Sequence, residues 1–574
     1  MPKVVVFRFL FFVFVCVLFF LNFNFNYFHV AGADFYSRFQ LDSESLVLGR
    51  VLQDFSNPNY DSVFGLGFAD VGVEGIYKAF ELKKTVVDYR EYISNFGLQG
   101  DLYTLLYNKL GGQSLEFLKG FCSALTSFFI VSLLFVSSKI FGLKFAICIA
   151  ISLFFSPWIV LFSNNLYWSP YTWFAPVLFS WLIFAYSNVG LKLLFSLLFF
   201  LSVFIKCLFG YEYLSAVLIF ASLPVFVLPV LNGRGLNYKS LINQLSLLLG
   251  LSVLAFSAAL ALHADLRAES LTGGLSSIWY QDVLRRTHGD SVVFNPVYRE
   301  SLEATIWDVI ILYLISWRTD ILYPIPGSYF LYAFLFCLSV LAYEWIEEDK
   351  KFKFNFLLFL VSFLAGVSWL VLAKAHSYIH QHMNYVLWYL GFVSSLLYLT
   401  IIGAEHFWSL LRSSVYLDKV FVLLRIVLSH KYYRIIFVFC FITGCLIVSV
   451  SADYLNKKEI LTDKLQEAEL IYQDRDFSVY VSKELILFKS KSCDRLVNER
   501  RFFVHVYGMK GEFINLDFNW FDIRGGGSLN SDTFIFPLCM VDVNLPQIAK
   551  QKLVFGQFKP GSRFWQVEHR MSAD

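Results

Sequence analysis

Charge is scarce in this chain of 574 residues. Asp, Glu, Lys and Arg make up 16% of it, whereas soluble domains carry roughly 25%. The 47 basic and 44 acidic residues give a net charge of +3, which is too small to indicate a nucleic acid as partner. Nine cysteines over this length exclude a dense disulfide scaffold. The sequence also lacks a phosphate-binding glycine loop, an HExxH motif and a nucleophile elbow, so no nucleotide-binding signature is present.

Hydrophobic residues dominate instead. They account for 57% of the chain, Phe occurs 65 times and mean hydropathy is +0.59. A helix needs about 20 apolar residues to cross a bilayer, so long uncharged stretches predict membrane spans. About eleven spans follow, the first between Arg8 and Asp34. The others lie near residues 120–138, 145–163, 170–188, 191–208, 213–231, 241–262, 327–345, 355–373, 384–402 and 435–452.

Basic residues predict the orientation of these spans. Lys3 and Arg8 precede the first span and place the N-terminus in the cytoplasm. A signal peptide cleaved near residues 31–33 is the alternative, but that site lies far from the end of the apolar run, so a retained anchor is favoured. Each loop assigned to the inside carries Lys or Arg. The C-terminus then lies outside.

This topology predicts a transmembrane module over residues 1–452, with large external loops at 22–115 and 263–326. The last piece, residues 453–574, has a different composition. Its apolar and polar residues alternate in short runs separated by Gly, Asn and Pro, which predicts a small extracytoplasmic β-rich domain. Cys493 and Cys539 would face the oxidising side there. A disulfide between them is favoured, and buried thiols are the alternative.

Polar residues gather at the outer ends of the predicted spans. Asp42 and Glu44 begin a stretch in which Leu48, Val51 and Leu52 have helical spacing, as in a helix that lies in the membrane interface with its apolar stripe in lipid. Its two carboxylates could serve as a general base and an orienting partner for a sugar hydroxyl. An ordinary helix N-cap is the alternative.

A second group lies at the turn between the fifth and sixth spans and contains Lys206, Tyr211, Glu212 and Tyr213. A lysine at the membrane surface either binds a lipid phosphate or extends its ammonium group into the headgroups. The adjacent acid and the two tyrosines favour a polar pocket, and the two explanations for the lysine stay open.

A third group follows the ninth span and contains Lys374, His376, His380, His382 and Asn384. Four-residue spacing puts two of the histidines on one helix face, but a metal site needs three or four ligands. Hydrogen bonding to phosphate or sugar is therefore favoured, with interfacial packing as the alternative. A divalent metal is a further alternative that is not favoured, and no other cofactor is expected.

Arginines and aromatic residues complete the candidates. Guanidinium groups bind phosphate with two parallel hydrogen bonds, and Arg318, in amphipathic sequence, is the preferred phosphate ligand. Arg285 and Arg286 are expected to be solvated. The aromatic residues near the outer boundary predict an interfacial belt, with stacking on sugars as the alternative. They are Trp158, Tyr167, Trp168 and Trp173.

With these residues placed, the layout resembles the GT-C superfamily of membrane glycosyltransferases, which includes protein O-mannosyltransferases and aminoarabinose transferases. The matching features are a first span with its N-terminus inside, an acidic external loop, about ten further spans and an external C-terminal domain. The resemblance implies transfer of a sugar from a polyprenyl phosphate to a glycan, lipid or protein acceptor. It also implies an integral protein of the bacterial inner (plasma) membrane, in contact with membrane lipids.

Carried to this sequence, the resemblance implies that Asp42 is the base, with Glu44 as the neighbouring acid and Asp34 as a substitute. The sequence Asp-Ser-Glu departs from the adjacent Asp-Glu of many members. The donor phosphate would be bound by Lys206, Arg318 and Lys374. Substrate would be bound by Tyr211, Glu212, His376, His380, His382 and Asn384.

Two other functions fit the sequence less well. A flippase or other carrier of lipid-linked oligosaccharides would place ionisable groups near the middle of its spans, where this sequence has few. An O-antigen polymerase or ligase also has a large external loop with arginines, but the size of the predicted C-terminal domain argues against it.

Overall fold

A computed structural model describes residues 2–413 and separate stretches between 468 and 570. Within the first range it leaves out residues 59, 61, 87, 111–113, 234–236, 295–297 and 318. The chain forms two compact units. The first consists of Met1–Tyr378 and Met383–Trp408, and the second of Ile379–His382 and Ser409–Asp574.

The first unit is a bundle of long apolar helices. Within the described residues, seven helical segments are long and apolar enough to cross a membrane, which makes the chain a polytopic helical membrane protein. They are α1 (Pro2–Phe25), α6 (Leu115–Phe141), α10 (Val189–Phe209), α11 with α12 (Leu214–Ala221 and Leu223–Leu231), α13 (Tyr238–Arg267), η3 with α18 (Gly327–Tyr329 and Phe330–Ile346) and α19 (Phe352–Leu372).

Two further segments are bent. Helices α7 (Leu143–Phe154) and α8 (Pro157–Ser163) meet at 67°. Ser156 accepts a hydrogen bond from the backbone N–H of Ile159, and Pro157 follows it as the first residue of α8, so a new helix begins there. The second bend, of 52°, separates α21 and η4 (Gln381–Asn384 and Tyr385–Tyr389) from α22 (Phe392–Ser413).

Seven to nine spans therefore lie within the described residues. The predicted span at 170–188 corresponds to α9 (Tyr171–Ala185), an apolar helix of 15 residues. The predicted span at 435–452 lies outside the described residues. The total of about eleven spans stays a prediction.

The loop after α1 is folded. It contains α2 (Ala33–Arg38), α3 (Leu41–Ser56), α4 (Gly72–Glu81), α5 (Leu98–Lys109) and an antiparallel pair, β1 (Gly67–Ala69) with β2 (Tyr89–Glu91). Leu48, Val51 and Leu52 are at most 1% exposed. The expectation that α3 lays this stripe in lipid is therefore wrong, because α4, α5 and β1 pack on the helix.

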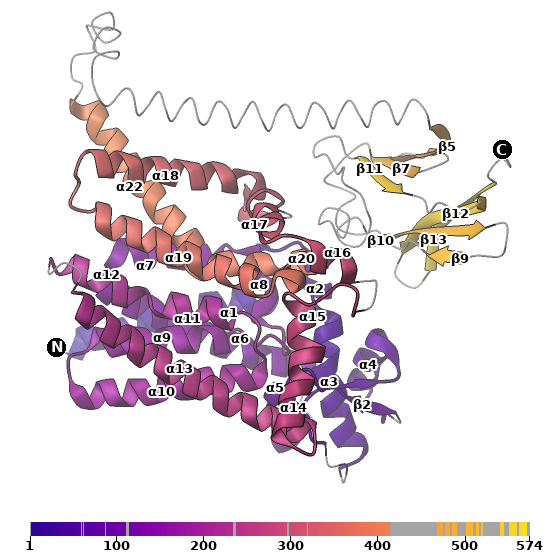
Figure 1. Cartoon of the computed structure of the whole chain (residues 1–574), viewed down its shortest axis with the longest axis horizontal. Coiled ribbons are helices and arrows are strands. Elements are labelled where there is room, and N and C mark those ends of the chain that lie inside the picture. Colours follow the sequence, from indigo (N-terminus) through magenta and orange to yellow (C-terminus); the bar gives the residue numbers. More distant parts are fainter. Residues whose placement is uncertain are drawn as a thin grey trace, which may run out of the picture. The chain divides into compact units, whose positions relative to one another are not determined.

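The segment between α13 and α18 is also helical for much of its length. It contains α14 (Leu271–Ile278), the π-helix η1 (Trp279–Val283), α15 (Leu284–Arg286), α16 (Arg299–Glu303), α17 (Ile306–Ile315) and the hairpin β3–β4 (Asp320–Leu322 and Ile325–Pro326). In Figure 1, α3, α4, β2, α14 and α15 gather at one end of the first unit. The N-terminus and the α12–α13 and α18–α19 connections lie at the other end.

The predicted aromatic belt is part of the protein interior. Trp158 and Trp173 are fully buried, and Tyr167 and Trp168 are at most 8% exposed. Trp168 stacks on Tyr213, with ring centroids 5.4 Å apart. These rings therefore face neighbouring helices instead of headgroups, because the turn between α8 and α9 is covered by the folded loop after α1.

The described part of the second unit beyond α22 consists of strands in two antiparallel sheets. One has the order β11-β7-β6-β5, and the other has the order β10-β8-β12-β13 with β9 paired to β8. That they form an extracytoplasmic domain with limits at 453–574 stays a prediction, and Cys493 and Cys539 lie outside the described residues. The strands are β5 (Glu469–Gln473), β6 (Phe477–Val481), β7 (Leu485–Ser490), β8 (Arg501–Gly508), β9 (Phe513–Asn515), β10 (Phe518–Asn519), β11 (Met540–Asn544), β12 (Lys550–Lys559) and β13 (Ser562–Arg570).

Candidate functional site

A buried turn between α8 and α9, residues 164–170, is the centre of the candidate site. The side-chain oxygen of Asn165 accepts hydrogen bonds from the backbone N–H groups of Tyr167 and Trp168 at 3.1 and 3.2 Å, which closes the turn locally. Two polar clusters lie on this turn. One contains Glu44 and the other contains Glu212 and Arg286.

Glu44 is fully buried in the first turn of α3. One carboxylate oxygen accepts from the backbone N–H of Leu166 at 3.0 Å. The other accepts from the Tyr77 hydroxyl at 2.6 Å and pairs with the Lys119 ammonium at 2.9 Å. Burial and the nearby carboxylate raise the pKa of Tyr77, so its hydroxyl stays a donor at physiological pH. Glu44 thus links α3, α4, α6 and the buried turn.

Asp42 lies two residues earlier and has the opposite environment. Its side chain is exposed and makes no hydrogen bond or ion pair with any residue that the structure describes, while its backbone carbonyl accepts from the Ser45 hydroxyl at 2.6 Å. Its position in the first turn of α3 favours a negative charge, because the backbone N–H groups there point toward it. Asp42 is therefore the accessible carboxylate of the pair. The side chain of Asp34 is not among those that the structure describes.

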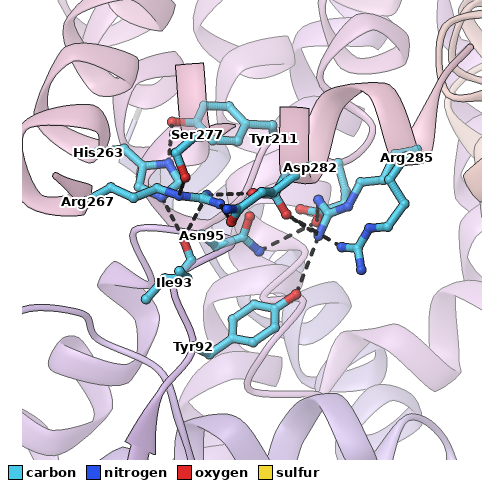
Figure 2. Close-up of polar contacts among 12 residues, drawn as sticks. Tyr92, Ile93, Asn95, Tyr211, His263, Arg267, Ser277, Asp282 and Arg285 are labelled. Carbon is cyan, nitrogen blue, oxygen red and sulfur yellow. Dashed lines mark hydrogen bonds and ion pairs between the residues drawn. The ribbon is translucent and has the colours of Figure 1, made fainter. Parts of the chain in front are cut away.

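The second cluster contains three arginines and two acids, and Figure 2 shows its central part. Arg267, at the end of α13, pairs with Asp282 at 2.5 Å and donates to the backbone carbonyl of Ile93 at 3.1 Å. Arg285 approaches the same Asp282 at 3.5 Å. These contacts attach η1 and α15 to the end of α13 and to the loop after α1.

Arg286 connects this cluster to the buried turn. It lies 3.3 Å from Glu212 and 3.4 Å from the Tyr92 hydroxyl. Burial by itself lowers its pKa, but Tyr92 and the acids Glu212 and Asp282 raise the pKa more, so the guanidinium stays charged. Asn95 donates to Glu212 at 3.5 Å and to the Tyr167 hydroxyl at 2.8 Å.

The charges of this cluster do not cancel. Arg267, Arg285 and Arg286 carry three positive charges against two negative charges on Glu212 and Asp282, which leaves one positive charge. The side chain of Arg285 is 30% exposed, more than those of Arg267 and Arg286 at 2% and 19%. Arg285 is therefore the arginine of this cluster that is most accessible to an anion.

The two lysines predicted to hold phosphate donate to backbone carbonyls. Lys206 is 3% exposed, and its ammonium donates to the carbonyl of Gly210 at 2.6 Å, at the end of α10. Lys374 donates to the carbonyls of Leu302 and Ala304, each at 2.6 Å, at the end of α16. Burial lowers the pKa of Lys374, and Asp308 opposes this shift. Both lysines stabilise helix ends, where cations are favoured.

The other predicted substrate ligands divide between two places. Tyr211 lies 3.3 Å from His263, beside the arginine cluster (Figure 2). Asn384 is fully buried and accepts from the Tyr213 hydroxyl at 2.6 Å, so the second and third predicted groups do meet in the core.

The histidines do not share one helix face. Helix α20 (Lys374–Ile379) ends before His380, and α21 starts at Gln381. His376 packs against Trp369, with centroids 6.3 Å apart, and His380 packs against His382 at 5.4 Å. Arg318 lies outside the described residues.

Several residues of the site have no clear signal in the sequence. The expectation of a solvated Arg286 is wrong, because Glu212, 74 positions away, pairs with it. Asp282, His263, Asn95 and Lys119 come from segments that meet only in the folded chain. His263 and Lys119 adjoin predicted spans, whereas Asn95 and Asp282 lie inside the two long loops and offered no cue.

Residues of the loop after α1 line an open cleft with a volume of about 690 Å³. It combines aromatic rings with side chains that donate and accept hydrogen bonds, a combination that suits a sugar. These side chains belong to Gln53, Asn57, Tyr60, Phe68, Asp70, Asp88, Tyr89 and Arg90, which line the cleft.

No protein family, no curated protein and no solved structure matches the chain. The candidate site therefore depends on its own geometry. The buried turn contacts α3 through Glu44, two residues after the exposed Asp42, and contacts the arginine cluster through Asn95 and Glu212.

Proposed function

We propose that the chain is a membrane glycosyltransferase that moves a sugar from a polyprenyl phosphate to an extracytoplasmic glycan, lipid or protein. The observation that carries the proposal is the contrast between Asp42 and Glu44. Glu44 is saturated by Lys119, Tyr77 and the Leu166 N–H. Asp42 is exposed in the first turn of α3, one of the elements that gather at the end of the bundle opposite the N-terminus (Figure 1). A general base must reach its substrate, and of these two carboxylates Asp42 is the one able to do so.

The reaction requires little from the protein beyond a base and a cationic site. The acceptor hydroxyl oxygen attacks the anomeric carbon, the bond from that carbon to the phosphate oxygen breaks, and Asp42 takes the hydroxyl proton. The polyprenyl phosphate leaves as an anion. A single displacement of this kind inverts the anomeric configuration.

The departing phosphate needs positive charge close to it. Arg285, with support from Arg286, suits this role better than Lys206 and Lys374, whose ammonium groups donate to backbone carbonyls. A guanidinium also fits a phosphate with two hydrogen bonds. The cleft over Tyr60, Phe68 and Arg90 is the proposed place for a saccharide acceptor.

The test is transfer of labelled sugar from a polyprenyl-phosphate donor by the purified protein in detergent, where no compartments exist and transport gives no signal. The sugar that the donor should carry is the one missing from cell-surface glycans after deletion of the gene. Asp42→Asn should reduce kcat by at least about 100-fold, in the range expected of a general base. Glu74→Gln, an exposed carboxylate on α4, is the matched control and should retain full activity. Full activity of Asp42→Asn would remove this residue as the base, and no transfer by the wild type would favour the carrier.

A further inference from the structure

Another cluster of ionisable groups, separate from the Glu44 cluster and the arginine cluster, lies at the end of the first unit that carries the α18–α19 connection. Glu344 is in the last turn of α18, Asp349 is in the connection and His406 is on α22. One ligand atom from each lies within 4.8 Å of the others, and the Nε2 atom of His406 is 3.1 Å from Glu344. Two helices and the connection between α18 and α19 thus bring two carboxylates and an imidazole to one point.

The charge of Glu344 lacks a permanent counterion. Its side chain is fully buried, and among the described residues its ion-pair partner is His406, which carries charge only when protonated. The nearby Lys144 pairs with Glu405 at 2.5 Å. A buried carboxylate without a cation is costly, so this position calls for a proton on His406 or for a metal ion.

The environment of Asn355 favours a metal ion over a proton on His406. It is fully buried in the first turn of α19, and its amide nitrogen donates to both oxygens of Glu344 at 2.7 and 2.9 Å. Its amide oxygen is buried and has no hydrogen-bond partner. Rotation of the amide by half a turn would exchange the two atoms and present a neutral oxygen to a cation bound at Glu344.

We propose that Glu344, Asp349 and His406 bind a divalent first-row transition cation, with Asn355 as a fourth or orienting ligand. Imidazole together with carboxylates suits Zn²⁺, Mn²⁺ or Fe²⁺, whereas Mg²⁺ and Ca²⁺ favour sites made of oxygen alone. Ligand distances of about 2.0 to 2.2 Å require the three atoms to close from their present spacing. His406 has 24% of its side chain exposed, which leaves a path for entry.

Such an ion would fasten α22 to the α18–α19 pair. Near this end the described contacts between these elements include the His406–Glu344 pair, and Tyr343 lies against the His406 ring at 5.2 Å. Bonds from three elements to one metal would fix their spacing more firmly than a single His–Glu pair.

The test uses the full chain without an affinity tag, stripped with a chelator and titrated with Zn²⁺ in detergent. Wild-type protein should take up about one Zn²⁺ per chain by elemental analysis and unfold at a higher temperature, because the ion binds the folded state. His406→Gln and Asp349→Asn should bind Zn²⁺ at least about 10- to 100-fold more weakly. His29→Gln, in the exposed loop after α1, is the matched control and should behave as wild type. Mg²⁺ should give no comparable shift.

Asp349 is partly exposed, so its variant tests the site even if a change at buried Glu344 prevents folding. Zinc uptake that is absent from wild type, or unchanged in both variants, would overturn the proposal. An unfolding temperature that rises with His406 protonation but not with Zn²⁺ would also overturn it and leave a plain Glu344–His406 ion pair.

Discussion

Asp42 and Glu44 have the same chemical group and lie two positions apart, yet the fold gives them different environments. Helical geometry turns two such positions about 200° apart around the axis. One therefore faces the bundle, where Lys119 and Tyr77 meet it, and the other faces outward. Burial alone assigns Glu44 to structure and leaves Asp42 available for chemistry.

This contrast gives a prediction about stability. Glu44→Gln should lower the free energy of unfolding by roughly 2 kcal/mol, because Lys119 loses its counterion. The loss falls below the usual range for a buried pair, since the side chain of Lys119 is 23% exposed and keeps some contact with solvent. Asp42→Asn should change the free energy of unfolding by less than about 0.5 kcal/mol, as expected of an exposed side chain without partners. Denaturant unfolding in detergent measures both, and equal losses would contradict the assignment.

At the scale of elements, the loop after α1 depends on close backbone contact. A Cβ atom added to Gly100 on α5 would lie 1.6 Å from the carbonyl oxygen of Gly65. A Cβ on Gly49 of α3 would lie 2.4 Å from the carbonyl oxygen of Gly67. The two helices can pack on this chain segment because neither glycine has a side chain.

Gly100→Ala should therefore destabilise the loop by about 2 to 3 kcal/mol, as overpacking does where backbone atoms have to move. Hydrogen exchange of residues 41–109 should rise, and proteolysis within the loop should become faster. Gly250→Ala on α13 is the control, since nothing lies within 4 Å of its added Cβ. A Gly100 variant that exchanges as slowly as this control would show that the loop adjusts without cost.

At the scale of the whole molecule, the sidedness of the first unit is the property on which the proposed function depends. The predicted external segments gather at one end, and the N-terminus and the α18–α19 connection lie at the other (Figure 1). Basic loops predict that the second end is cytoplasmic.

Cysteine labelling tests this orientation. In intact cells, a membrane-impermeant maleimide should label Asp88→Cys and Asp290→Cys, which are exposed positions in the two predicted external loops. Lys350→Cys, exposed in the α18–α19 connection, should react only after the membrane is permeabilised. The parent protein provides the background from its own cysteines. Labelling of all three in intact cells, or of Lys350→Cys alone, would refute the predicted topology.

The sequence by itself determined that the chain is a helical membrane protein, because the length and apolarity of a span are local properties. Each described apolar helix of span length lies where an uncharged stretch predicted one. It also marked Asp42, Glu44 and Glu212 as polar residues near the ends of spans. Their roles depend on how close they lie to residues that are distant in the sequence, and spacing along the chain does not give those distances.

Tertiary structure decided which of these groups are paired. Arg286 meets Glu212 across 74 positions, and Glu344 meets His406 across 62 positions. Lys206 and Lys374, which were predicted to bind phosphate, donate to backbone carbonyls instead. The aromatic residues assigned to the membrane boundary are core residues for the same reason. Burial and charge pairing are set by what the rest of the chain places beside a residue, and local sequence does not carry that information.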